Sequence, residues 1–101
     1  MSLRAQIKPG QRWISETEPE LGVGIMLKVE FKRVELIFPA ANERRQYASD
    51  SAPLRRVALK VGEMLETQEG EVIEVDTVLE RDGLLVYLCG EREVEESGLS
   101  D

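Results

Sequence analysis

The chain has 101 residues, of which 42% are hydrophobic and 33% charged, and its formal net charge at pH 7 is −7. This balance is typical of one ordinary folded domain or two very small ones, so disorder is not expected. One cysteine and no histidine exclude an internal disulfide and argue against a zinc site.

Nothing in the sequence indicates a membrane or export signal. No apolar run approaches the roughly 20 residues that span a bilayer. No charged-then-apolar signal segment precedes the first expected strand. We therefore expect no membrane contact and a cytoplasmic location.

The charge differs between the two halves of the chain. Residues 1–52 carry eight Lys or Arg and seven Asp or Glu, a net charge of +1, whereas residues 53–101 carry five and thirteen, a net charge of −8. An acidic surface repels a phosphate backbone and suits a basic protein surface. Any nucleic-acid contact is therefore expected in the first half, and a protein contact suits the second.

The first expected strand covers residues 11–15, after the turn signal Lys8-Pro9-Gly10. Trp13 is the only tryptophan of the chain. In a barrel of about 50 residues one large aromatic side chain fills much of the core, so we expect Trp13 to be buried. The carboxylates of residues 16–21 have no histidine to join them in metal or acid–base chemistry, so this segment is expected to be a solvated loop.

A β-hairpin with one buried face is expected from residue 22 to residue 39. Apolar residues recur with a period of two at positions 25, 27 and 29, and again at 34, 36 and 38. The two glycines at its start allow a strong bend, and Pro39 ends the hydrogen-bond ladder. Because a lone hairpin is barely stable in water, neighbouring segments must supply further strands.

Two short strands, 43–48 and 54–59, are expected on either side of a turn at residues 49–53. They carry four arginines and a tyrosine, which together suit a basic, partly aromatic surface for nucleic acid or for acidic protein loops. The alternative is that the arginines pair with nearby carboxylates across strands and contribute little. The sequence favours neither interpretation over the other. The candidate contact residues are Arg44, Arg45, Tyr47, Arg55 and Arg56.

Phe31 is a further candidate contact residue, because it lies at the turn between the two strands of the hairpin. The alternative is that its ring folds back onto the hairpin, and this interpretation is slightly favoured. The five aromatic residues are spread over strands and a turn. An aromatic cage for methylated side chains, which needs several convergent exposed rings, is therefore not expected.

The second half of the chain repeats the opening of the first. Lys60-Val61-Gly62 matches Lys8-Pro9-Gly10 at a distance of 52 residues, and Leu65 takes the place of Trp13. Residues 66–70 then replace the first polar loop.

The repeat continues through the strands that follow. Residues 72–79 correspond to 23–30. The apolar side chains change from odd positions, Ile73 and Val75, to an even one, Val78, which predicts a β-bulge near Asp76 and Thr77. Arg81-Asp82-Gly83 predicts a tight hairpin turn, and residues 84–89 form the matching third strand. The second unit therefore repeats turn, strand, loop, strand, tight turn and strand.

These elements predict an all-β protein with two tandem small, strongly bent antiparallel sheets of the SH3-like or Tudor-like barrel type. The first subdomain is expected to cover residues 1–52 and the second residues 53–101. Residues 91–101 are acidic and too poor in apolar side chains to complete both remaining strands. We therefore expect the second subdomain to be truncated at its carboxyl end.

Catalysis is not expected from this chain. The P-loop pattern GxxxxGK[ST] does not occur, so these residues cannot cradle ATP phosphates. Serine and cysteine nucleophiles have no histidine base, and Cys89 lies in an apolar strand that suits a small core residue. We expect no catalytic residue, no metal site and no bound cofactor.

Five segments also carry a family resemblance: 10–15 (GQRWIS), 18–24 with the pattern ExELGxG, 36–39 (LIFP), 45–48 (RQYA) and 83–87 with the pattern GLLxY. In this order they resemble the amino-terminal region of the RapA family, the bacterial RNA polymerase-associated ATPases of the Swi/Snf class. The resemblance covers nearly the whole chain from Lys8 onward. It implies two Tudor-like subdomains ahead of a motor, in a protein that binds RNA polymerase and promotes its recycling in transcription.

Since the P-loop is absent, the resemblance implies a docking and regulatory module whose catalytic part lies outside these 101 residues. Its implied partners are core RNA polymerase and the ATPase motor of the same longer chain. The alternative function is a nucleic-acid-binding SH3-like module that uses the basic first half.

Overall fold

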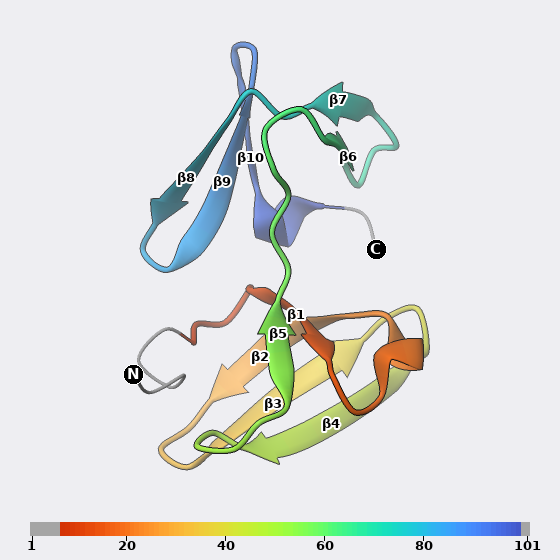
Figure 1. The fold of residues 1–101 in the computed structure, drawn as a ribbon, viewed down its shortest axis with the longest axis vertical. Coiled ribbons are helices and arrows are strands. Elements are labelled where there is room, and N and C mark those ends of the chain that lie inside the picture. Colours follow the sequence, from red (N-terminus) through yellow and green to blue (C-terminus); the bar gives the residue numbers. More distant parts are fainter. Residues whose placement is uncertain (1–6, 100–101) are drawn as a thin grey trace. The chain divides into compact units, whose positions relative to one another are not determined.

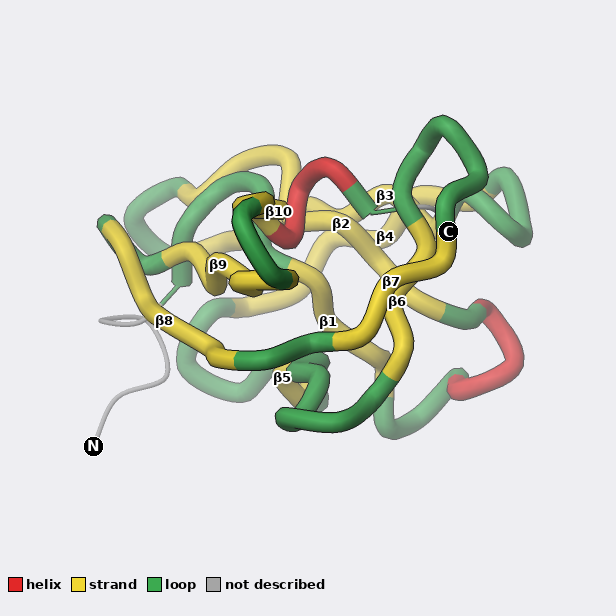
Figure 2. The backbone as a smooth tube through the Cα atoms, turned by 90° about the horizontal axis from the view of Figure 1, so that it is seen from above, coloured by secondary structure: helices red, strands yellow, loops and turns green. Residues whose placement is uncertain are grey.

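A computed structural model describes residues 7–99, and their regular structure consists of antiparallel β-strands and two short 3-10 helices (Figures 1 and 2). The predicted all-β class is confirmed. The chain divides into two compact units between Val57 and Ala58. The boundary expected between residues 52 and 53 differs from this division, because the strand Leu54–Arg56 pairs with the first strand of the chain and so belongs to the first unit.

The first unit is a five-stranded antiparallel sheet in the order β4-β3-β2-β1-β5. A 3-10 helix, η2, lies between its first two strands. The elements are β1 (Arg12–Ser15), η2 (Pro19–Leu21), β2 (Val23–Val29), β3 (Arg33–Phe38), β4 (Glu43–Ala48) and β5 (Leu54–Arg56).

A β-bulge interrupts β2 and reverses which of its side chains face the core. Met26 pairs with Leu36 and Lys28 with Glu35, so Leu27 is the extra residue. Met26 is consequently buried at 1% exposure, whereas Leu27 is 37% exposed. Before the bulge the inward positions are Gly24 and Met26, so the expectation that Ile25 and Leu27 face the core is wrong. After the bulge the inward parity shifts by one residue, and Val29 packs against the core as expected.

The core of the first unit is closed by a contact between a glycine and an aromatic ring. Gly24 pairs with Trp13 across β1 and β2, and a Cβ added at Gly24 would lie 2.6 Å from Cε1 of Phe38. Phe38 and Trp13 are both buried, which confirms the expectation for Trp13. Only glycine leaves room for the Phe38 ring at this position.

The second unit contains a two-stranded sheet, β6-β7, and a three-stranded sheet in the order β10-β9-β8. Acidic residues after Gly90 supply β10 and a second 3-10 helix, η3. The elements are β6 (Met64–Glu66), β7 (Val72–Glu74), β8 (Thr77–Arg81), β9 (Leu84–Cys89), β10 (Arg92–Glu95) and η3 (Glu96–Gly98).

The structure has a break between β7 and β8 in place of the β-bulge expected near Asp76 and Thr77. β7 pairs with β6, whereas β8 pairs with β9, so the chain changes neighbours at this point. The predicted hairpin turn is also present: Asp82 and Gly83 have φ angles of 53° and 84°, and Arg81 pairs with Leu84. Positive φ at both central residues is what a two-residue turn of this kind requires.

Cys89 lies in the core of the second unit, as expected for a small apolar side chain. Leu65 occupies the place that Trp13 has in the first unit and is also buried. Partly buried side chains surround this core. Its buried members are Leu65, Val75, Tyr87, Cys89, Val94 and Leu99.

The two units share the same backbone pairing between opening turn and second strand. The N–H of Gly10 donates to the carbonyl of Met26 at 2.9 Å, and that of Gly62 donates to the carbonyl of Val75 at 2.8 Å. The two glycines have φ angles of 93° and 94°, which side chains rarely tolerate. This correspondence supports the internal repeat proposed from the sequence.

The side chains of the two turns also correspond. Oε1 of Gln11 accepts from the N–H of Lys8 at 3.0 Å, and Oε1 of Glu63 accepts from the N–H of Lys60 at 2.7 Å. These bonds satisfy turn amides that have no strand partner.

We predict that Gly24→Ala destabilises the first unit by about 2 kcal/mol, because the added methyl group overpacks the core against Phe38. Denaturant unfolding followed by Trp13 fluorescence measures this change. A double-mutant cycle with Phe38→Leu is the control: together the two changes should cost less than the sum of the single changes. Wild-type stability of the Gly24→Ala variant would contradict the close contact.

Candidate functional site

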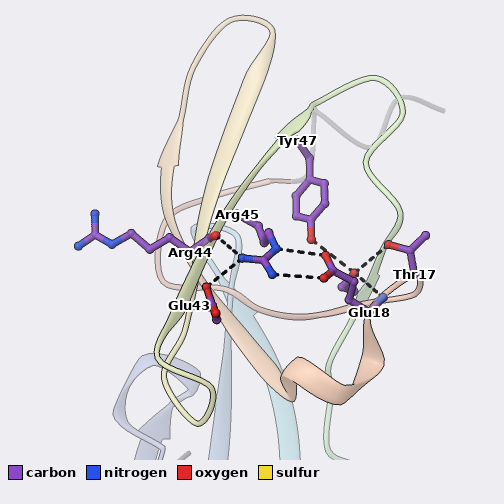
Figure 3. A network of polar contacts seen from close by, with 7 residues as sticks. Thr17, Glu18, Glu43, Arg44, Arg45 and Tyr47 are labelled. Atoms are coloured by element: carbon purple, nitrogen blue, oxygen red, sulfur yellow. Dashed lines mark hydrogen bonds and ion pairs between the residues drawn. The ribbon is translucent and has the colours of Figure 1, made fainter.

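Arg45 is held between two carboxylates and is not available as an open cationic surface. Its Nε and Nη2 donate to Oε1 and Oε2 of Glu18 at 3.1 and 3.3 Å, and Nη1 donates to Oε2 of Glu43 at 3.2 Å (Figure 3). The hydrogen bonds with Glu18 and then Glu43 raise the pKa of Arg45 above its ordinary value. This two-pronged geometry fixes the guanidinium in place.

Tyr47 joins the same network through its hydroxyl group, which donates to Oγ of Ser15 at 3.4 Å. Oγ of Ser15 also accepts from the N–H of Glu18 at 3.1 Å and lies 3.2 Å from Oγ1 of Thr17 (Figure 3). The ring of Tyr47 is half-buried against the first core. The network therefore ties β4 to the loop before η2, and the loop expected to be merely solvated has an anchoring role.

Arg44 extends from β4 with 68% of its side chain exposed, and its Nη1 lies 3.4 Å from Oε2 of Glu35. Gln46 donates to the other oxygen of this carboxylate at 3.1 Å. This is the cross-strand pairing that the sequence offers as the alternative to a binding surface. Most of the Arg44 side chain is exposed despite this pair, so Arg44 remains accessible to a partner.

Arg55 and Arg56 lie on β5, which occupies the opposite edge of the sheet from β4. Nη1 of Arg56 donates to the carbonyl of Arg12 at 3.1 Å, and its guanidinium lies 5.5 Å from the centroid of the Trp13 ring. Arg55 is exposed. The sheet order therefore separates the four arginines into two pairs and does not place them in one row.

Phe31 is the most exposed of the large hydrophobic residues in the described part of the chain, at 71%. The N–H of Glu30 donates to the carbonyl of Arg33 at 2.8 Å, which closes a tight turn with Phe31 and Lys32 at its centre. Nζ of Lys32 lies 5.7 Å from the ring centroid. The slightly favoured interpretation that the ring folds back onto the hairpin is wrong, because so short a turn leaves the ring exposed.

The observed division of the chain increases the charge difference between the units. Residues 1–57 carry ten Lys or Arg and seven Asp or Glu, a net charge of +3, whereas residues 58–101 carry three and thirteen, a net charge of −10. Two of the three cations in the second unit are already engaged. Arg81 binds Glu93 at 3.3 Å and Arg92 binds Glu71 at 2.7 Å. The second unit is therefore strongly acidic.

Sequence reasoning did not single out the exposed apolar residues of the second unit. Met64 and Val72 are 55% and 59% exposed, although they lie in strands. In the structure each alternates with a residue of the inner face, Leu65 and Ile73. The strands are only three residues long, so a period of two could not be recognised from sequence.

The described residues offer no arrangement for metal chemistry. Between residues 7 and 99, no group of three or more His, Cys, Asp or Glu side chains is placed to hold a metal ion. No helix in this range is long and apolar enough to cross a membrane. Burial raises the pKa of the Cys89 thiol, and the charge of Asp76 raises it further. A buried, protonated thiol is a poor nucleophile.

Comparison with known sequences identifies both units. The family described as RapA N-terminal Tudor like domain 1 matches residues 7–57, and the family described as RapA N-terminal Tudor like domain matches residues 60–101. Together the two matches cover nearly all residues that the structure describes. They assign a Tudor-like fold to each unit.

Similar, much longer proteins carry the name RNA polymerase-associated protein RapA. The chain is 44% identical over 91 residues to the protein of Vibrio vulnificus (strain CMCP6). These 91 residues are 90% of the chain but 9% of the relative. It is 47% identical over 83 residues to the protein of Pectobacterium carotovorum subsp. carotovorum (strain PC1). That alignment covers 82% of the chain and 8% of the relative. The chain therefore spans less than a tenth of the length of these relatives.

We predict that alkaline pH destabilises the second unit through Cys89. Burial favours the neutral thiol, so the folded pKa is raised and stability falls once the unfolded thiol ionises, above about pH 8.5. The free energy of unfolding measured by denaturation between pH 7 and 10 should decrease more for the wild type than for Cys89→Ala. Parallel pH profiles for the two proteins would contradict this role of burial.

Proposed function

Because this chain belongs to the family of RapA N-terminal Tudor-like domains, we propose that it is the non-catalytic docking and regulatory module of a longer RNA polymerase-associated protein. In this proposal the chain helps to hold an ATP-hydrolysing Swi/Snf-type motor on core RNA polymerase. It also restrains the ATPase activity of the motor. Through both roles it contributes to polymerase recycling in the cytoplasm. The single observation that carries the proposal is the match of both units to this family.

The charge distribution supports a protein partner for the second unit. A net charge of −10 over 44 residues opposes contact with a phosphate backbone and favours a basic protein surface. Charges of this kind mainly increase the rate at which partners meet, and their effect is reduced by salt.

The arrangement of the arginines is consistent with this assignment. Arg45 is bound by Glu18 and Glu43, and Arg56 contacts Trp13, so two of the four candidate arginines support the fold. Arg44 and Arg55 are the exposed members of the group. They therefore provide matched variants that test a contribution of the first unit without disturbing its core.

We predict that removing residues 1–101 from the longer protein weakens its binding to core RNA polymerase by at least about tenfold and changes its ATPase rate. Binding is measured by surface plasmon resonance and ATP hydrolysis by phosphate release. The control is the intact protein with Arg44→Gln and Arg55→Gln, which should bind as the wild type does. If the deletion leaves both affinity and ATPase rate unchanged, the proposed function is wrong.

A second candidate function, nucleic-acid binding, is favoured by one observation. Phe31 is 71% exposed at the tip of the β2–β3 hairpin, and it is followed by two cations, Lys32 and Arg33. An exposed ring beside basic residues can stack on an unpaired base while the cations contact phosphates. The site would lie in the first unit, which has a net charge of +3.

If this second function is present, the isolated chain should bind a fluorescent single-stranded oligonucleotide, and affinity should fall steeply between about 50 and about 200 mM salt. Phe31→Ala should reduce affinity by about 1–3 kcal/mol, the usual effect of losing one stacked base. Leu27→Ala, an exposed apolar residue on the same hairpin, is the control. No binding by the wild type at low salt would exclude the nucleic-acid function.

A further inference from the structure

The outer face of the β6–β7 ribbon combines exposed apolar side chains with carboxylates. Met64 pairs with Glu74, and Glu66 pairs with Val72. Leu65 and Ile73, which lie between them, form the inner face and pack into the second core. Because residues directly opposite each other in a sheet share a face, the outer face is made by Met64, Glu66, Val72 and Glu74.

The two apolar side chains of this face are unusually exposed for strand residues. Met64 is 55% exposed and Val72 59% exposed, and Val61, in the turn before β6, is 66% exposed. Met64 and Val72 are diagonal neighbours in the register, close enough for a long side chain to bridge. Methionine is enriched at protein interfaces, because its flexible side chain adapts to a partner.

Among the described residues, the carboxylates of the same face have no partner of opposite charge. Within residues 7–99, neither Glu66 nor Glu74 makes an ion pair or a side-chain hydrogen bond, in contrast to Glu71 and Glu93, which bind arginines. Each unpaired carboxylate lies directly opposite an apolar residue. The face therefore presents two apolar groups and two negative charges in alternation.

The first unit does not present an equivalent face. The strand that corresponds to β6 is β1, which pairs with β5 over three residue pairs in addition to β2. In the described part of the second unit, the corresponding pairing is a single bridge between Thr67 and Leu99. Arg12, which corresponds to Met64 at the same spacing of 52 residues, is buried. The exposed apolar face is thus a property of the second unit.

We propose that the outer face of β6–β7 docks a protein surface that has apolar side chains at its centre and lysines or arginines around them. This inference rests on the proposed function and identifies the contact surface. Apolar contacts at the centre of an interface supply most of the affinity, and surrounding charges select the partner. Nucleic acid does not fit, since unpaired carboxylates repel phosphates. A second copy placed symmetrically on this face would bring like charges together.

The test measures binding of the 101-residue chain to purified core RNA polymerase. One variant, Met64→Thr with Val72→Thr, removes the apolar groups and keeps both charges. A second, Glu66→Gln with Glu74→Gln, keeps the apolar groups and removes the charges. The matched control is Leu79→Thr with Glu80→Gln, because Leu79 is also exposed on a strand of the second unit. Circular dichroism melting verifies that each variant is folded.

The inference predicts that the threonine variant binds at least about tenfold more weakly than the wild type, whereas the control binds equally well. The glutamine variant should bind more weakly at low salt, with a smaller salt dependence. If the wild type binds but the threonine variant binds equally well, this inference is overturned and the proposed function stands. If the wild type does not bind, both are overturned. A dimer of the free chain that the threonine variant abolishes would assign the face to self-association and overturn the inference.

Discussion

The hydrogen bond from each opening turn to the chain segment that follows the first loop of its unit is the constraint on which both cores depend. Gly10 and Gly62 adopt left-handed backbone conformations, and their N–H groups bind the carbonyls of Met26 and Val75. This contact fixes Met26 and Val75 in the two cores. The chain then bulges at Leu27 in the first unit and breaks at Val75 and Asp76 in the second, which lets one segment serve two neighbouring strands.

One scaffold thus carries two different surfaces. In the first unit, charged side chains serve the fold: Arg45 joins β4 to the loop before η2, and Arg56 covers Trp13. In the second unit, most charges are carboxylates, and the short β6–β7 ribbon leaves Met64 and Val72 exposed. Under the proposed function, the acidic unit is the part suited to a basic protein surface.

Local chemistry allowed much of the fold to be predicted from sequence. The Asp82-Gly83 turn, the burial of Trp13 and the matched glycine turns follow from backbone preferences and side-chain size. Which side chains of β2 face the core could not be predicted in this way, because Met26 and Leu27 are both apolar and only the strand register distinguishes them. The binding of Arg45 by Glu18 was also missed, since this pair is separated by 27 residues and is formed by the tertiary fold. Exposure of Phe31 likewise depends on the length of its turn.

The central claim is that the second unit, and not the arginine-bearing strands, is the part of this chain that meets a protein partner. Amide hydrogen exchange of the 101-residue chain, measured with and without core RNA polymerase, tests it most directly. The account predicts slower exchange in peptides from residues 60–76 on addition of the polymerase, with no change in residues 43–56. Protection confined to residues 43–56 would contradict it.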